Sequence, residues 1–198
     1  MKFKFLKLAA LILVIAAILV VTAACGSKKV ENKANLTVKV GYFPNMTHAQ
    51  ALVGLSDGTF QKALGDNVII EEHAFNAGPS EIEALLTGQI DLGYIGPVPA
   101  INGFVTSKGG LRIIAGAADA GAVLVARKGS NIKSVRDLDG KKVAIPQIGN
   151  TQDISLRNLL SEATLKDAAK GGTVIVLPVD NPDILTLISK GDIDAALV

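Results

Sequence analysis

Short apolar runs typical of β-strands alternate along the chain with stretches in which apolar residues recur every three or four positions, as on one face of an α-helix. The strand-like runs cover residues 38–43, 68–75, 91–95, 111–117, 122–127, 142–145, 173–179 and 195–198. The helical stretches cover residues 49–64 with a break at Gly58, 80–86, 96–105, 134–140, 151–165 and 182–189. Strands alternating with helices form βαβ units, so the pattern predicts an α/β protein with mainly parallel sheets.

One part of this pattern occurs twice. The phrase Gly88-Gln89-Ile90-Asp91 returns 103 residues later as Gly191-Asp192-Ile193-Asp194, and Lys39-Val40 returns at the same offset as Lys142-Val143. This offset is too long for a solenoid repeat. It predicts two similar lobes and a cleft between them, with lobe one at residues 36–121, a crossover at residues 122–134 and lobe two at residues 135–198.

The second copy of the repeat stops where the sequence stops. In the first copy the phrase continues through Tyr94-Ile95 into Gly96-Pro97, whereas the second copy ends at Val198. We therefore expect lobe two to be incomplete, in a C-terminally truncated protein. We also expect its last strand to lie exposed at a sheet edge, where a strand is open to aggregation.

The first 24 residues have the features of a secretory signal peptide. Three lysines at the start are followed by 17 uncharged residues that lead directly into the single cysteine, Cys25. This position resembles the lipobox of bacterial lipoproteins, which implies cleavage before Cys25, acylation of its thiol (palmitate) and a flexible tether at residues 25–35. The alternatives are an uncleaved membrane anchor, for which this run is short, and a buried structural cysteine.

Charge and composition exclude several classes of function. The formal charge is +2, and because the signal segment holds three lysines and no acid, the remainder carries about −1. No basic patch with interleaved aromatic residues is present, which argues against a nucleic-acid partner. The two histidines, His48 and His73, lie 25 residues apart without a carboxylate pattern, so we expect no metal site. Phosphate-binding glycine loops and nucleophile motifs are absent, so we expect no cofactor.

Five loops that follow predicted strands are candidates for a binding site, because open parallel sheets bind ligands at the carboxyl ends of their strands. Their side chains are mostly neutral hydrogen-bonding groups, without Lys or Arg, and they cover residues 45–48, 76–80, 96–99, 147–152 and 180–182. Ser80 and Glu83 fit a capping box that opens a helix. Helix starts offer unpaired N–H groups and a positive dipole end to an anion. Any one loop is more often an ordinary turn, but five in matching lobes predict an anion site.

Several segments, in this order and spacing, resemble the substrate-binding proteins of sulfonate, taurine and nitrate-type ABC importers. They are Gly41-Tyr42-Phe43, residues 58–65, Phe75-Asn76-Ala77-Gly78, residues 90–96, residues 137–143 and residues 191–194. The resemblance covers residues 36–198. It implies a two-lobed periplasmic-binding-protein-like fold (type II), each lobe a mainly parallel sheet flanked by helices, that closes on a small solute. It also implies an extracytoplasmic location at the cell membrane and, as partners, an ABC permease and its ATPase.

The resemblance places the ligand contacts in the loops described above. The expected ligand-binding residues are Asn45, Thr47, His48, Gly78, Pro79, Gly96, Pro97, Asn150, Thr151 and Gln152. Their amide and hydroxyl groups would hold an anionic or zwitterionic head group, each hydrogen bond to a charged group contributing ~1.5–3 kcal/mol. We expect no catalytic residue.

Two alternatives remain open on the sequence. One is a thiamine pyrimidine-precursor binding protein, or a synthase-like enzyme on the same fold, in which a histidine near the cleft such as His48 matters. The other is a cationic or zwitterionic solute whose ammonium group would meet Asp119, Asp153 or Asp180. His48 itself is a candidate ligand donor or general base, or else a solvated or capping histidine, and His73 is expected to be structural.

Overall fold

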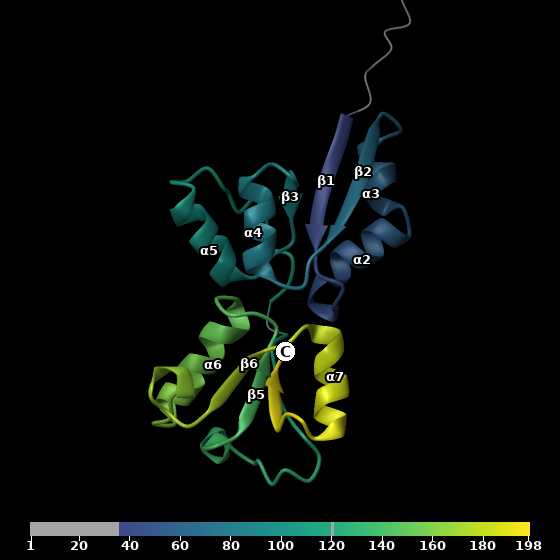
Figure 1. The fold of residues 1–198 in the computed structure, drawn as a ribbon. Helices are drawn as coiled ribbons and strands as arrows, with labels where there is room; N and C mark the ends of the chain where they lie inside the picture. The colour runs from purple at the N-terminus through teal and green to yellow at the C-terminus, as the bar shows by residue number, and fades with distance from the viewer. Residues whose placement is uncertain (1–35, 120) are drawn as a thin grey trace, which may run out of the picture. The chain divides into compact units, whose positions relative to one another are not determined.

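The computed structural model describes residues 36–119 and 121–198, and the first of its two sheets has three parallel strands (Figure 1). The strand order is β2-β1-β3, so that the first strand of the chain is central. The strands are β1 (Leu36–Tyr42), β2 (Val68–Ala74) and β3 (Leu92–Gly93), and β1 pairs with β2 from Leu36↔Val68 to Tyr42↔Ala74. The predicted signal peptide, Cys25 and the tether lie outside the described residues.

Four helices and one short 3-10 turn connect the strands of the first sheet. They are η1 (Met46–His48), α2 (Ala49–Ser56), α3 (Thr59–Leu64), α4 (Gly78–Leu86) and α5 (Pro97–Thr106). Gly58 separates α2 from α3 in a left-handed conformation (φ 73°), which confirms the predicted break. The βαβ order predicted from the apolar pattern is thus present in this half.

The second sheet has four strands in the order β4-β7-β5-β6. They are β4 (Leu124–Ala126), β5 (Lys142–Ile145), β6 (Ile175–Pro178) and β7 (Ala195–Leu197). Its helices and turns are η2 (Val135–Leu138), α6 (Thr151–Glu162), η3 (Ala168–Lys170) and α7 (Asn181–Lys190). β5, β6 and β7 are parallel and β4 is antiparallel to β7, which confirms a mainly parallel sheet.

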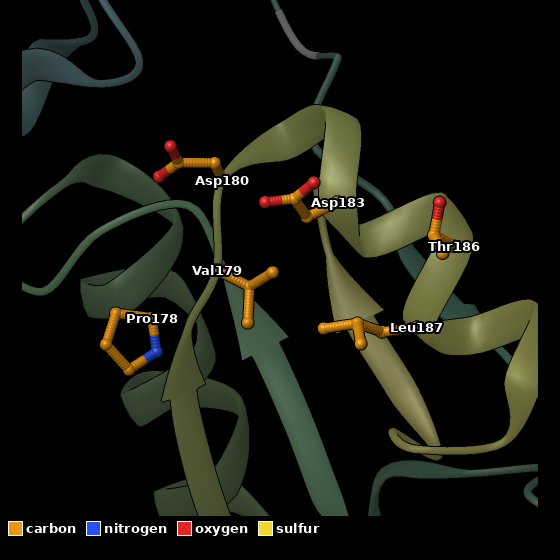
Figure 2. A pocket seen from close by; sticks show the side chains of 6 residues that line it. All are labelled: Pro178, Val179, Asp180, Asp183, Thr186 and Leu187. Atoms are coloured by element: carbon orange, nitrogen blue, oxygen red, sulfur yellow. The ribbon is translucent and has the colours of Figure 1, made fainter.

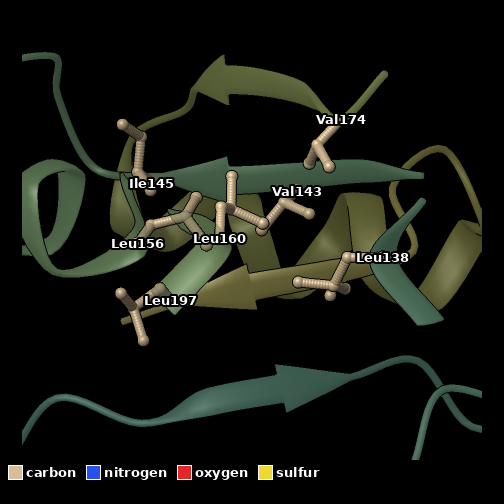
Figure 3. Packing of buried hydrophobic residues seen from close by; sticks show 8 residues of the cluster. Leu138, Val143, Ile145, Leu156, Leu160, Val174 and Leu197 are labelled. Atoms are coloured by element: carbon tan, nitrogen blue, oxygen red, sulfur yellow. The ribbon is translucent and has the colours of Figure 1, made fainter. Parts of the chain in front are cut away.

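Hydrophobic residues of the second sheet pack in two clusters, one on each face. Because side chains alternate along a strand, Val143 and Ile145 face α6, while Ala144 faces α7. Figure 3 shows the α6 side, whose buried members are Leu138, Val143, Ile145, Leu156, Leu160, Val174, Ala195 and Leu197. The buried members on the α7 side are Ala144, Ile184, Ile193 and Ala196.

The sequence repeat corresponds to a repeated structural unit. Each copy begins with a left-handed glycine that ends a helix, Gly88 (φ 71°) after α4 and Gly191 (φ 85°) after α7. Each copy ends with an aspartate whose carboxylate accepts from a lysine N–H of a neighbouring strand, in the middle of β1 in the first half and at the start of β5 in the second. The Asp91 carboxylate accepts from the Lys39 N–H at 2.8 Å, and the Asp194 carboxylate accepts from the Lys142 N–H at 3.0 Å. The repeated phrase therefore joins each helix to the strand that follows it.

Two local predictions are wrong. Residues 111–117 form no strand; Ile113 and Ile114 are 70% and 84% exposed, so this apolar run lacks the burial that would hold a strand in place. The capping box at Ser80 and Glu83 is not formed, because α4 begins earlier, with Ala77 as its N-cap and Pro79 in its first turn. Ser80 lies inside the helix and its hydroxyl donates to the Ala77 carbonyl.

The last strand is not an exposed edge, contrary to expectation. β7 lies between β5 and β4, and β4 covers it by pairing Val125 with Ala196. β4 belongs to the range predicted as the crossover, which shows that this range contributes a strand to the second sheet. The predicted domain boundaries themselves stay predictions.

Candidate functional site

All four helices described in the first half begin without a side-chain cap, and α4 and α5 are the two that follow the loops after β2 and β3. Among the described residues, neither Ala77, the N-cap of α4, nor Gly96, the N-cap of α5, makes a side-chain hydrogen bond to its helix. Their backbone conformation is extended, as is usual for an N-cap residue, and the first N–H groups of an α-helix have no partner within the helix. Pro97 and Pro99 remove two donors from α5, which leaves Val98 to supply the N–H of that turn. Uncapped helix starts of this kind favour a negatively charged group.

Small residues bring these helix starts close to one another. A Cβ atom on Gly78 would collide with the Pro99 ring, and a Cβ atom on Gly96 would collide with the hydroxyl of Thr151 at the start of α6. The Thr151 Oγ1 atom is buried and has no hydrogen-bond partner in the described part of the chain. Three of the expected ligand residues, Gly78, Gly96 and Thr151, therefore lie at one place, and two more, Pro79 and Pro97, follow Gly78 and Gly96 directly in the chain.

Asn45, Thr47 and His48 form a second group on η1. The Asn45 side chain accepts from the Thr47 N–H at 3.2 Å and from the Thr47 hydroxyl at 2.7 Å, so these two residues satisfy each other. The His48 ring stacks on Phe43 with 4.2 Å between ring centroids and lies 6.4 Å from the ring of Tyr94. Because Tyr94 precedes the Gly96 turn by two residues, it links this group to the helix starts.

His48 is held as a neutral imidazole. It is 6% exposed, and burial lowers its pKa to about 4. Its Nδ1 atom accepts from the Phe43 N–H at 3.0 Å, which places the ring proton on Nε2. His48 is therefore a hydrogen-bond donor through Nε2, and it is a poor general base near neutral pH.

At the start of α6, Asn150 and Asp153 have structural roles. The Asn150 side chain caps the helix by accepting from the Asp153 N–H at 2.8 Å. The Asp153 carboxylate is buried, accepts from the Gly149 N–H at 2.8 Å and pairs with Arg157 at 2.8 Å. Gln152 is half-buried beside them. Asp153 is thus satisfied internally, which removes it from the acids that could meet an ammonium group.

Sequence reasoning missed Asn76, which connects the loops after β2, β5 and β6. Its amide nitrogen donates to the Asp180 carboxylate at 2.8 Å and to the Pro146 carbonyl at 3.1 Å. Its amide oxygen accepts from the Asn181 N–H at 3.3 Å. The available signal was the position of Asn76 and Asp180 directly after predicted strands, in two of the five candidate loops.

An open hollow of about 400 Å³ lies beside the start of α7 (Figure 2). Its floor is apolar and its rim carries two carboxylates, and the lining consists of Pro178, Val179, Asp180, Asp183, Thr186 and Leu187. None of the ten expected ligand residues lines it. Carboxylates repel an anion, so this hollow suits a positively charged group, whereas the uncapped starts of α4 and α5 suit a negative one.

Within residues 36–119 and 121–198, no helix combines the length and the apolar character that a membrane crossing requires. No three His, Cys, Asp or Glu side chains in those ranges lie close enough together to hold a metal ion.

Several known binding proteins are similar to this chain. The taurine-binding periplasmic protein of Escherichia coli is 31% identical over 150 residues, which are 75% of this chain and 44% of that protein. The solved periplasmic aliphatic sulphonate binding protein of E. coli is 26% identical, with a TM-score of 0.57 over 82% of this chain and 54% of that one. The alkanesulfonate-binding protein of Xanthomonas axonopodis pv. citri, solved with MOPS bound, is 23% identical, with a TM-score of 0.62 over 82% and 54%.

The chain spans about half the length of the curated relatives it matches. The structural likeness confirms the periplasmic-binding-protein-like α/β fold. The match to one family covers most of the chain, from residue 31 to residue 198. The chain therefore belongs to the NMT1-like family.

Proposed function

We propose that this protein is an extracytoplasmic solute-binding protein that delivers a small anionic or zwitterionic solute, such as a sulfonate, taurine or nitrate, to an ABC importer. The observation that carries the proposal is the meeting of the uncapped starts of α4 and α5 with the start of α6 at Gly78, Gly96 and Thr151. Each helix end contributes roughly 0.3–1 kcal/mol toward an anion. Hydrogen bonds from neutral donors to the charged group add ~1.5–3 kcal/mol each.

The related proteins support this choice of solute. One similar protein is named for taurine, and a solved structure of the same fold holds MOPS, which is a sulfonate. A zwitterion has a second point of attachment here, because Asp180 and Asp183 at the hollow beside α7 attract an ammonium group. We therefore place the anionic head group at the helix starts and the ammonium group of a zwitterion toward α7.

Titration calorimetry with ethanesulfonate, nitrate, taurine and choline tests the proposal on the full chain. We expect the anions and taurine to bind, and choline, a cation without an acidic group, to bind more weakly than taurine because only the acids beside α7 can meet it. The variant Thr151→Val keeps the shape of the side chain and removes the hydroxyl, and it should weaken anion binding roughly tenfold or more. The matched control is Thr106→Val, at the exposed end of α5, which should bind as the unaltered protein does. Equal affinity of Thr151→Val and the unaltered protein would remove Thr151 from the site.

The lipid anchor is a separate part of the proposal. We infer acylation of Cys25 from the lipobox-like Thr22-Ala23-Ala24-Cys25. A palmitate probe should label the protein in bacterial membranes and should fail to label Cys25→Ser. A soluble, unlabelled protein would favour the enzyme alternative, against which stand the neutral, internally bonded His48 and the binding functions of the relatives.

A further inference from the structure

Glu81 differs from every other buried acid in the described part of the chain. Asp153 and Asp167 are buried and both pair with Arg157, at 2.8 and 2.9 Å. Glu81 is 0% exposed, and neither of its carboxylate oxygens has a hydrogen-bond partner among residues 36–119 and 121–198. An ionised carboxylate without a partner is costly to bury, so this side chain is held as a neutral acid.

The space around Glu81 is made by two glycines. A Cβ atom on Gly41 of β1, or on Gly93 of β3, would collide with the Glu81 Oε1 atom. At the same offset of 103 residues, the second half has Ala144, Ala196 and Ile184 in these three positions, and all three belong to one apolar cluster. In the first half, the Glu81 carboxyl group therefore takes the position of an apolar side chain, and it fits there because the two strand residues beside it are glycines.

Few charged groups share the surroundings of Glu81. On the same face of the sheet as Gly41, β1 carries Lys39 and β2 carries Glu71 and His73, which are bonded to each other at 2.9 Å. α5 has no titratable residue, and Glu83 on α4 is exposed. Burial alone raises the pKa of Glu81 to about 8, without an offsetting charge. His48 is already neutral over the same pH range.

Glu81 also lies close to the candidate anion site. It follows Gly78 by three residues, which is about 4.5 Å along the helix axis. A hydrogen bond of about 3 Å added to this rise gives a separation on the order of 8 Å between Glu81 and an anion held at the first N–H groups of α4. Two negative charges at that distance repel one another, and with an effective dielectric constant of about 20 the repulsion corresponds to a change in affinity of about 30-fold.

We propose that Glu81 is a proton-binding site coupled to the solute site, so that the protein binds its anion with Glu81 protonated and releases it more readily when Glu81 loses the proton. The inference rests on the proposed function, because it takes the starts of α4 and α5 as the anion site. The coupling is reciprocal, so a bound anion makes Glu81 hold its proton more tightly.

The first test measures affinity against pH with probes whose charge is constant, ethanesulfonate and nitrate. We expect the unaltered protein to bind equally well at pH 6 and pH 7 and to lose affinity above pH 8, by about 30-fold in total. Glu81→Gln should bind at all pH values as the unaltered protein binds at pH 6, and Glu81→Met serves as a second neutral variant if Glu81→Gln fails to fold. Glu83→Gln removes an exposed charge from the same helix and should keep the pH dependence of the unaltered protein.

A second test needs no solute. The infrared band of a protonated carboxyl group should be present near neutral pH in the free protein, should vanish as the pH rises past about 8, and should be missing from Glu81→Gln. Absence of this band at pH 6 would overturn the proton site, and a pH dependence that Glu81→Gln retains would overturn the coupling. If neither probe binds at any pH, the proposed function fails, while the infrared band still decides whether Glu81 holds a proton.

Discussion

The two halves of the molecule share one backbone plan and differ in what fills it. In both, a helix ends at a left-handed glycine and an aspartate accepts from a lysine N–H of the neighbouring strand, β1 or β5. The second half packs both faces of its sheet with buried apolar residues. The first half has Glu81, Gly41 and Gly93 where the second has Ile184, Ala144 and Ala196. The same backbone unit therefore encloses an apolar core in the second half and, in the first half, a buried carboxyl group without a partner in the described chain.

The largest predicted effect is the influence of Glu81 on how the free energy of unfolding depends on pH. Because the pKa of Glu81 is raised from 4.5 to about 8 on folding, the folded protein keeps a proton that the unfolded chain loses between these values. On its own, Glu81 therefore lowers the free energy of unfolding as the pH rises from about 4.5 to about 8, by on the order of 5 kcal/mol at about 1.4 kcal/mol per pKa unit. Buried His48, whose pKa folding lowers from 6.5 to about 4, acts in the opposite direction between those two values. The net fall in the unaltered protein should therefore lie between about pH 6.5 and pH 8 and amount to about 2 kcal/mol.

Urea unfolding at several pH values measures this dependence: the unaltered protein and Glu83→Gln should lose stability between about pH 6.5 and pH 8, whereas Glu81→Gln should gain stability from about pH 4 to pH 6.5 and lose none above that. A free energy of unfolding that stays constant between about pH 6.5 and pH 8 in the unaltered protein would contradict a neutral Glu81.

The second-largest effect is expected from truncating a side chain in the apolar core of the second half. Leu156 of α6 is 0% exposed in the cluster shown in Figure 3. Leu156→Ala should lower the free energy of unfolding by ~2–5 kcal/mol, because the lost contacts leave a cavity. Ile154→Ala on the same helix is the control, since Ile154 is 47% exposed, and it should cost less than ~1 kcal/mol. Equal losses for the two variants would show that α6 does not pack as described.

A smaller difference is expected between the two aspartates of the repeat. Asp194 is partly buried and also bonds Arg127 at 3.2 Å, whereas Asp91 is exposed. Asp194→Ala should lower the free energy of unfolding by ~1.5–3 kcal/mol and Asp91→Ala by less, ~0.5–1.5 kcal/mol.

The contribution of Asp194 should also depend on pH. The hydrogen bond from the Lys142 N–H, followed by Arg127, holds the pKa of Asp194 below its usual value of 3.8. Its stabilising contribution is therefore complete above that value and is lost as the pH falls through the lower pKa of the folded state. Thermal unfolding at pH 7 and pH 3 measures both effects, and a larger loss from Asp91→Ala would reverse this ranking.

The smallest effects should be equal in the two halves. Gly88 and Gly191 both have positive φ, and a Cβ atom on either would meet no atom closer than 3.9 Å. Gly88→Ala and Gly191→Ala should therefore each cost about 1 kcal/mol, from the left-handed conformation alone. Chemical denaturation of both variants measures this, and a difference of more than about 1 kcal/mol would show that the two turns are not equivalent.

The sequence predicted most of the fold because its signals are local. The apolar runs gave seven strands close to their observed bounds, and Gly58 separated two helices. The exceptions depended on distant contacts. Residues 111–117 are apolar but have no strand partner within the described chain, and the partner of β7 is β4, over 70 residues earlier. An apolar pattern reports that a segment can be buried, and it does not report what covers it.

The candidate site was predicted less completely. Gly78, Gly96 and Thr151 do lie together, but Asn150 caps its own helix and Asn45 bonds Thr47. Asn76 and Glu81 were missed, because one acts through three bonds to distant loops and the other through burial. For Glu81 a signal existed in the sequence, since the repeat aligns this acid with Ile184.

The sequence by itself determined the order of the elements, the repeated helix-to-strand unit and the family, because these follow from periodicity, glycines and short motifs along the chain. Only the tertiary structure decided which helix starts meet, that His48 is neutral and that Glu81 has no partner. The physical reason is that charge state and hydrogen bonding depend on the atoms and the water around a group, and folding brings those atoms from segments far apart in the sequence.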